Sequence, residues 1–169
     1  MPNKVLYTPP ELLTADHDVT AFACGEPALN RFIKRYALIN QANEISRTYV
    51  TTRDGYVAGF YTLAFGSISH EDATAKIKAE LPQYPIPIIL LARLAVDLRE
   101  KGRGLGKALL RDALLRSLQA SDIAGLRAVL THAKNDEAKN FYLKFGFEPS
   151  PTHDQHLMLS IRDLKENMI

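Results

Sequence analysis

Cysteine is almost absent from this chain, because Cys24 is the only one among 169 residues. A single cysteine excludes an intramolecular disulfide framework and any zinc site built from a cysteine cluster. A chain without disulfides fits a reducing compartment. We expect Cys24 to be a small buried residue rather than a nucleophile.

Glycine and proline are also scarce, with nine of each, which excludes collagen-like and glycine-rich architectures. Hydrophobic residues make up 46% of the chain and charged residues 24%. Such a chain has enough apolar surface to offset its ordering entropy, so disorder is not expected as its main state. The length is typical of one domain, and no repeat or linker is visible. We therefore expect a single domain over residues 1–169.

Long hydrophobic runs are missing too. The most apolar stretch, Ile86–Ala92, is far shorter than the ~20 residues that span a bilayer. Residues 1–10 contain one lysine with no apolar core behind it, which is unlike a signal peptide. We therefore expect a cytoplasmic protein that has no membrane partner.

Charge of one sign is not in large excess, since 21 lysines and arginines face 19 acids, for a net charge of +2. The sequence pI of 8.6 lies below the value of ~9 that many nucleic-acid-binding domains exceed. The cations are unevenly distributed, however. The segment 99–116 contains two acids, Glu100 and Asp112. It contains six cations: Arg99, Lys101, Arg103, Lys107, Arg111 and Arg116.

Three of these cations have helical spacing. Arg103, Lys107 and Arg111 recur every four residues, so they would form one stripe if a helix began at or before Arg103. Smaller basic patches occur at Lys34–Arg35, at Arg47, and at Lys76 with Lys78. Coenzyme phosphates or plain solvation explain such charges as readily as RNA does.

Hydrophobic periodicity predicts helices and strands in a mixed order. Helices are expected over Ala28–Leu38, Glu71–Glu80, Leu105–Gln119 and Asp136–Lys144, the last with Gly146 as its stop signal. Strands are expected over Arg47–Thr52, Tyr56–Leu63, Ile86–Val96, Arg127–Thr131 and His156–Ser160, with Asp54–Gly55 as a hairpin turn. This order indicates an α/β protein with a mixed sheet.

A glycine-rich turn follows the apolar strand Ile86–Val96 and precedes a helix. Gly102, Gly104 and Gly106 would let the backbone approach a bulky phosphate, which the helix N-terminus attracts. The turn is neither a P-loop nor a G-x-G-x-x-G fingerprint, because its glycines recur at every second residue. By itself it is equally consistent with a simple turn.

Two motifs together resemble the GNAT N-acetyltransferases. The family pattern [QR]-x-x-G-x-[GA] reads Lys101-x-x-Gly104-x-Gly106, with lysine where the family usually has glutamine or arginine. The pattern N-x-x-A-x-x-F-Y-x-x-x-G-F reads Asn135, Ala138, Phe141, Tyr142, Gly146 and Phe147. The resemblance covers residues 45–160. It implies an α/β, single-domain GNAT (acyl-CoA N-acyltransferase) fold, a mixed central sheet with flanking helices. A helical region over about residues 1–45 would precede an acetyl-CoA-binding core over about residues 86–147.

This resemblance also implies a cosubstrate and site residues. Acetyl-CoA would pair its pantetheine arm with the backbone of Leu94, Ala95 and Val96, where an N–H polarises the thioester carbonyl. Its pyrophosphate would be bound by the turn Lys101, Gly102, Arg103, Gly104, Leu105, Gly106 and Lys107. Asn135 would bond to the arm. Tyr142 would be the general acid that protonates the departing sulfur, because a phenol with a pKa near ~10 is protonated at pH 7.

A narrower likeness extends over nearly the whole chain. Six segments resemble the GNAT-type toxins of bacterial toxin–antitoxin pairs: Ala23–Gly25, Leu29–Asn30, Ala37–Leu38, Arg47–Val50, Gly59–Tyr61 and Arg93–Asp97. This implies acetylation of the α-amino group of aminoacyl-tRNA, inhibition of translation and a homodimer. It also implies a ribbon-helix-helix antitoxin, through which the pair binds promoter DNA. Two alternatives stay open: an acetyltransferase for a small amine or a protein N-terminus, and a non-catalytic acetyl-CoA-binding module.

No general base is assigned. An α-amine titrates near ~8 in a free peptide, so part of the acceptor is neutral without one. Glu44, Asp97 and His132 are candidates only. We expect no metal, because His153 and His156 have no second pair or acidic cluster nearby in the sequence. Arg93, in the apolar strand, is expected to help seat the phosphate or 3′ end of the acceptor.

Overall fold

The computed structural model describes residues 6–168. Residues 1–5 and 169, which belong to the expected domain 1–169, lie outside this range. The helical elements are α1 (Pro27–Arg31), the π-helical turn η1 (Phe32–Tyr36), α2 (Ala37–Ala42), the 3-10 turn η2 (His70–Asp72), α3 (Ala75–Lys78), the 3-10 turn η3 (Leu98–Glu100), α4 (Leu105–Ile123), α5 (Asp136–Leu143) and α6 (Ile161–Met168). The strands are β1 (Glu11–Leu12), β2 (Arg47–Arg53), β3 (Tyr56–Ile68), β4 (Ile86–Val96), β5 (Ala128–His132), β6 (Glu148–Pro149) and β7 (His156–Ser160).

The strands form a seven-stranded mixed sheet in the order β1-β2-β3-β4-β5-β7-β6. The pair β4 and β5 is parallel, whereas β2 and β3, and β5 and β7, are antiparallel. This confirms the expected mixed α/β class. Within residues 6–168, no helix has both the length and the apolar content that a bilayer crossing requires.

The chain divides into two compact units. Unit 1 comprises the chain up to Ala64 together with Arg93–Ala113, and unit 2 comprises Phe65–Ala92 together with the chain from Leu114. The strands β3 and β4 and the helix α4 each contribute residues to both units. The expected domain boundaries remain a prediction.

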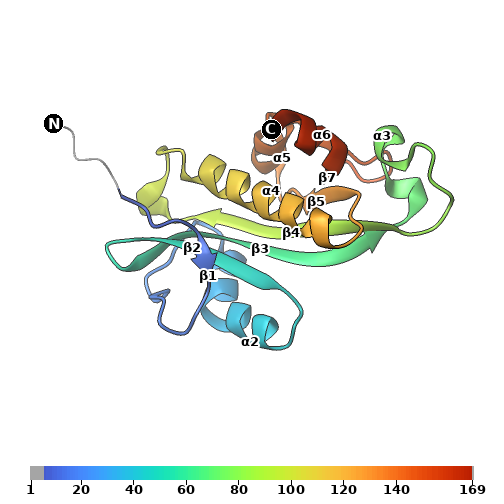
Figure 1. The fold of residues 1–169 in the computed structure, drawn as a ribbon. Helices are drawn as coiled ribbons and strands as arrows, with labels where there is room; N and C mark the ends of the chain where they lie inside the picture. Colours follow the sequence, from blue (N-terminus) through green and yellow to red (C-terminus); the bar gives the residue numbers. More distant parts are fainter. Residues whose placement is uncertain (1–5, 169) are drawn as a thin grey trace. The chain divides into compact units, whose positions relative to one another are not determined.

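Unit 1 holds the hairpin β2–β3 and the helical segment α1–η1–α2 (Figure 1). The hairpin turn has positive φ at both Asp54 (50°) and Gly55 (83°), as a tight two-residue turn between twisted strands requires. Phe32 on the helical segment packs on Phe60 of β3, with ring centroids 6.2 Å apart. The predicted helix and hairpin are therefore confirmed.

Gly59 of β3 allows α4 to pack closely on the sheet of unit 1. A Cβ at this position would lie 2.8 Å from Leu109 Cδ1 and 3.1 Å from the carbonyl oxygen of Ala95. Real Cβ atoms essentially never approach another heavy atom as closely as 2.8 Å. The missing side chain of Gly59 thus fixes where the first turns of α4 lie against β3 and β4.

Unit 2 is built around β5 and β7, which pair from Ala128↔Ser160 to His132↔His156. The helices α5 and α6 both contact β7. The helix α6 was not expected, because its sequence is polar and buries only Ile161 and Leu164 among its first turns. The two-residue strands β1 and β6 were also missed, since so short a segment has no detectable periodicity.

Candidate active site

In unit 1, the glycine-rich turn has the conformation that an anion cradle needs. Gly102 and Gly104 both have φ of +80°, and a Cβ at either position would meet nothing within 4 Å. These glycines are therefore required by backbone conformation and not by crowding. The helix α4 begins at Leu105, and its first backbone bond runs from Ala108 N–H to the Gly104 carbonyl. The N–H groups before Ala108 thus precede the helical ladder and can face a ligand.

A buried carboxylate anchors the start of this turn. Glu100 is fully buried and accepts hydrogen bonds from the phenols of Tyr7 and Tyr56, each 2.6 Å, and from Arg53 Nη1 at 3.0 Å. Burial alone would raise the pKa of Glu100, but these bonds outweigh it and hold the pKa below its ordinary value. Three side chains distant in sequence therefore fix the residue that precedes Lys101.

Asp97 and Arg99 form a second clamp on the same turn. The guanidinium of Arg99 donates to both carboxylate oxygens of Asp97 at 2.9 Å and lies 4.0 Å over the ring of Tyr56. Asp97 also accepts a bond from the backbone N–H of Ala23. Although burial raises the pKa of Asp97, the bonds from Arg99 lower it overall. Asp97 is thus a structural anchor here and poorly suited to accept a proton.

The expected stripe of Arg103, Lys107 and Arg111 on one helix face is shortened to two residues. Because α4 begins at Leu105, Arg103 precedes the helix, and only Lys107 and Arg111 of the three share a helical face. Both side chains are exposed. Arg99, which the count of six cations included, is neutralised by Asp97.

Arg93, on the last part of β4, is half-buried and lies with its guanidinium carbon 3.7 Å from the centre of the Phe32 ring. Burial lowers the pKa of Arg93, although an arginine remains charged at neutral pH. Leu94–Val96 follow it at the end of the strand. A positive group is therefore held beside the backbone segment expected to bind the acetyl-CoA arm.

In unit 2, Tyr142 of α5 is buried and packs against Phe141 and Phe147, with ring centroids 5.2 and 5.4 Å away. Burial raises the pKa of Tyr142, and a hydrogen bond with the Thr131 side chain offsets part of this rise. Thr131 in turn donates to the carbonyl of Leu91 at 3.0 Å. The phenol is therefore protonated at neutral pH, as a proton donor must be.

Asn135 is the N-cap of α5. Its side-chain oxygen accepts a hydrogen bond of 2.8 Å from the backbone N–H of Ala138. The amide N–H groups of the same side chain could donate to a ligand. The motif asparagine thus starts the helix that positions Tyr142.

Three of the five histidines form a stack in unit 2. His132 and His156 face each other across β5 and β7 at 3.9 Å between ring centroids, and His153 stacks on His156 at 4.5 Å. Burial lowers the pKa of both His132 and His156. Residues 6–168 contain no group of three His, Cys, Asp or Glu side chains placed to hold a metal ion.

Two residues important for the site are not distinguished by the sequence alone. Glu100 looked like one acid among cations, and Thr131 like an ordinary strand residue. No local signal marks either residue, because their partners are Tyr7, Arg53 and Tyr56 in one case and Tyr142 in the other.

Comparison with known families now defines the class of protein. Residues 44–149 match the acetyltransferase (GNAT) domain family. The chain therefore belongs to the GNAT acetyltransferases.

Among individual relatives, the chain is 50% identical to the tRNA-acetylating toxin of Mycobacterium tuberculosis, over 94% of this chain and 95% of that one. It is 31% identical to the probable toxin TacT of Sinorhizobium fredii, over 90% of each chain. Among solved structures, AtaT complexed with acetyl-methionyl-tRNAfMet is 29% identical with a TM-score of 0.89, covering 96% of this chain and 99% of that one. AtaTR bound with AcCoA is 30% identical with a TM-score of 0.83, covering 96% and 98%.

Proposed function

We propose that this protein transfers the acetyl group of acetyl-CoA to the α-amino group of aminoacyl-tRNA and, as the toxin of a toxin–antitoxin pair, inhibits translation. The observation that carries the proposal is the 50% identity to a tRNA-acetylating toxin over 94% of the chain. AtaT, of closely similar fold, is known in complex with acetyl-methionyl-tRNAfMet.

The residues of unit 1 suit the binding of acetyl-CoA. The positive-φ turn at Gly102 and Gly104 and the free start of α4 offer backbone N–H donors to a pyrophosphate. Lys101, Arg103 and Lys107 add positive charge. The backbone of Leu94–Val96 would pair with the pantetheine arm as an added strand, and one of its N–H groups would stabilise the oxyanion by about 3 kcal/mol.

Tyr142 is the proposed general acid. As the amine nitrogen bonds to the acetyl carbon and the carbon–sulfur bond breaks, the phenol gives its proton to the sulfur, which leaves as a thiol. The amine loses its own proton to solvent, and an amide forms.

The acceptor requires no dedicated base, because an α-amine near a pKa of ~8 is partly neutral at pH 7. Arg93 is proposed to bind the phosphate or 3′ end of the acceptor. The flat face of its guanidinium stacks on the ring of Phe32. The N–H donors, which lie in the plane of the guanidinium, therefore remain directed toward an anion.

Partners follow from the same relatives. AtaT is known bound to the C-terminus of the antitoxin AtaR, and the AtaT–AtaR complex is known bound to DNA. We propose a corresponding ribbon-helix-helix antitoxin, promoter DNA bound through it, and a homodimer for this protein. A cytoplasmic location follows from the acceptor, since charged tRNA is found there.

The function is tested by incubating the protein with labelled acetyl-CoA and bulk aminoacyl-tRNA. Label in the aminoacyl fraction, lost in Tyr142→Phe, is the expected result. If label appears only on small amines or on protein N-termini, the acceptor is one of these and the proposed acceptor is wrong. Binding of acetyl-CoA without any transfer would mean a non-catalytic module.

A further inference from the structure

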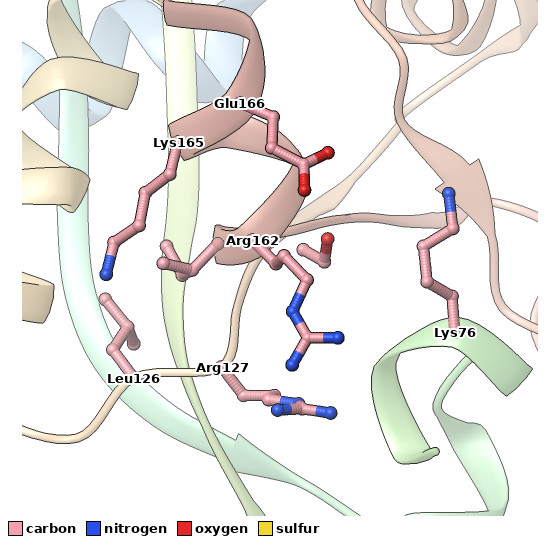
Figure 2. Close-up of a pocket in the computed structure, with 8 residues that line it drawn as sticks. Lys76, Leu126, Arg127, Arg162, Lys165 and Glu166 are labelled. Carbon is pink, nitrogen blue, oxygen red and sulfur yellow. The ribbon is translucent and has the colours of Figure 1, made fainter. Parts of the chain in front are cut away.

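A second group of cations lines a cavity in unit 2, and none of these residues is among those assigned above. A cavity of about 430 Å³ is lined by four cations, Lys76 of α3, Arg127 before β5, and Arg162 and Lys165 of α6 (Figure 2). Glu166 is the one acid among its lining residues. We call this cavity the basic pocket.

The guanidinium of Arg127 is positioned without being neutralised. Its Nε donates to the carbonyl of Ile77 at 2.8 Å, and its Nη2 donates to the carbonyl of Ala79 at 3.2 Å. Carbonyl oxygens are uncharged, so these bonds fix the side chain and leave its full positive charge. The remaining N–H donors of Arg127 are available to a ligand.

Within residues 6–168, the cations of α6 differ from Lys76 in their pairing. Lys76 is paired with Glu148 and Asp163, at 3.3 and 2.9 Å. For Arg162 and Lys165, by contrast, the described residues provide no ion pair, although both side chains are exposed one turn apart on α6. Figure 2 shows the guanidinium ends of Arg127 and Arg162 pointing into the same part of the pocket.

Two guanidinium groups that share a pocket repel each other unless an anion lies between them. A phosphate satisfies both, because its oxygens accept paired N–H bonds from planar guanidinium groups. Ser160, the last residue of β7, and Ile161, the first residue of α6, also border the pocket. The pocket therefore matches a phosphate better than an uncharged ligand.

We infer that the basic pocket binds backbone phosphates of the acceptor RNA, through Arg127, Arg162 and Lys165. This rests on the proposed function, which supplies an acceptor with one phosphate per nucleotide. Binding there would add affinity for the body of the tRNA, independent of the aminoacyl end, and would weaken with salt as phosphate binding does.

The test compares two acceptors with the double variant Arg162→Glu/Lys165→Glu. One acceptor is full-length aminoacyl-tRNA, and the other is a 3′-aminoacylated trinucleotide that lacks the stem. We expect kcat/KM on the tRNA to fall at least ~10-fold while that on the trinucleotide stays within twofold. The slope of log affinity against log salt should decrease by about one for each phosphate that the variant no longer binds.

The matched control is Lys34→Glu/Arg35→Glu, which changes the net charge equally on exposed residues of η1. An equal loss in the control would mean diffuse charge attraction and overturn the inference. A loss on both acceptors would point to damage of the catalytic structure and also overturn it. Arg162→Gln/Lys165→Gln repeats the test if the charge-reversed variant does not fold.

Other outcomes separate this inference from the proposed function. If the wild type acetylates neither acceptor, the proposed function fails, and direct binding of uncharged tRNA by wild type and variant still tests the pocket. Undiminished tRNA binding in the variant, together with lost binding of the antitoxin, would assign the pocket to a protein partner and overturn the inference.

Discussion

The guanidinium of Arg93 lies 3.7 Å above the ring of Phe32, so that the end of β4 is joined to the π-helical turn η1, which begins at that phenylalanine. The stack holds Arg93 through its flat face. Because guanidinium donors lie in the plane of the group, the arrangement orients them without using them.

If Arg93 binds the acceptor, Arg93→Glu should abolish acetylation of aminoacyl-tRNA by repelling its phosphates, while acetyl-CoA binding stays unchanged. Arg93→Lys, which keeps the charge but not the planar fork, should give an intermediate rate. Transfer assays and equilibrium binding of acetyl-CoA measure the two effects. Full activity of Arg93→Glu would remove Arg93 from the site.

Tyr142→Phe should reduce kcat by about 10²- to 10⁴-fold, as expected for the loss of a general acid. The phenyl ring keeps the packing against Phe141 and Phe147, so stability should fall by only about 1 kcal/mol, for the bond to Thr131. Single-turnover transfer and urea unfolding give both values. A variant with wild-type kcat would show that another group protonates the sulfur.

The pH dependence of the same step follows from the burial of Tyr142. Burial raises its pKa above the ordinary 10.0, against a smaller opposite effect of Thr131. A general acid acts in its protonated form, so a raised pKa extends activity toward higher pH. We expect no alkaline loss of kcat below about pH 10. A loss of kcat near neutral pH, absent in Tyr142→Phe, would contradict this.

Gly59→Ala should destabilise the fold by about 1 to 3 kcal/mol, because the new methyl would overlap Leu109 and crowd the Ala95 carbonyl. The matched control is Gly66→Ala on the same strand, whose Cβ would lie 3.4 Å from the flexible end of Ile88. Urea unfolding of the two variants compares them. Equal free energies of unfolding for the two variants would show that α4 can move away from β3 without loss of stability.

Glu100→Gln should cost about 3 kcal/mol at pH 7, because it removes one charge from a buried ion pair. The native pKa of Glu100 is lowered from 4.5, so its contribution is present above the unfolded pKa and is lost as pH falls through the native value. Wild-type stability should therefore decline more steeply below about pH 5 than that of Glu100→Gln.

The control for Glu100 is Glu44→Gln, whose carboxylate is 75% exposed in its pair with Arg47. Exposed pairs contribute little, so this change should leave both the stability and its pH profile nearly unaltered. Parallel acid-unfolding curves for wild type and Glu100→Gln would show that the carboxylate is not the group responsible.

The sequence by itself determined the features that depend on neighbouring residues. The Asp54–Gly55 turn, the buried strand Ile86–Val96 and the Asn135–Phe147 motif were all predicted where the structure has them. Each is recognisable because backbone conformation and side-chain periodicity are local properties. The glycine-rich turn belongs here too, since positive φ at Gly102 and Gly104 is a local requirement.

Only the tertiary structure decided what is built from distant segments. The anchor of Glu100 needs Tyr7, Arg53 and Tyr56, and the basic pocket needs three elements between Lys76 and Lys165. The sequence showed only separate charged residues in a chain whose net charge is +2. Folding pairs some of them, as in Arg53 with Glu100, and leaves Arg162 without an ion pair among the described residues. Whether a charge is neutralised depends on the distance between side chains in space. The spacing of residues along the chain does not determine that distance.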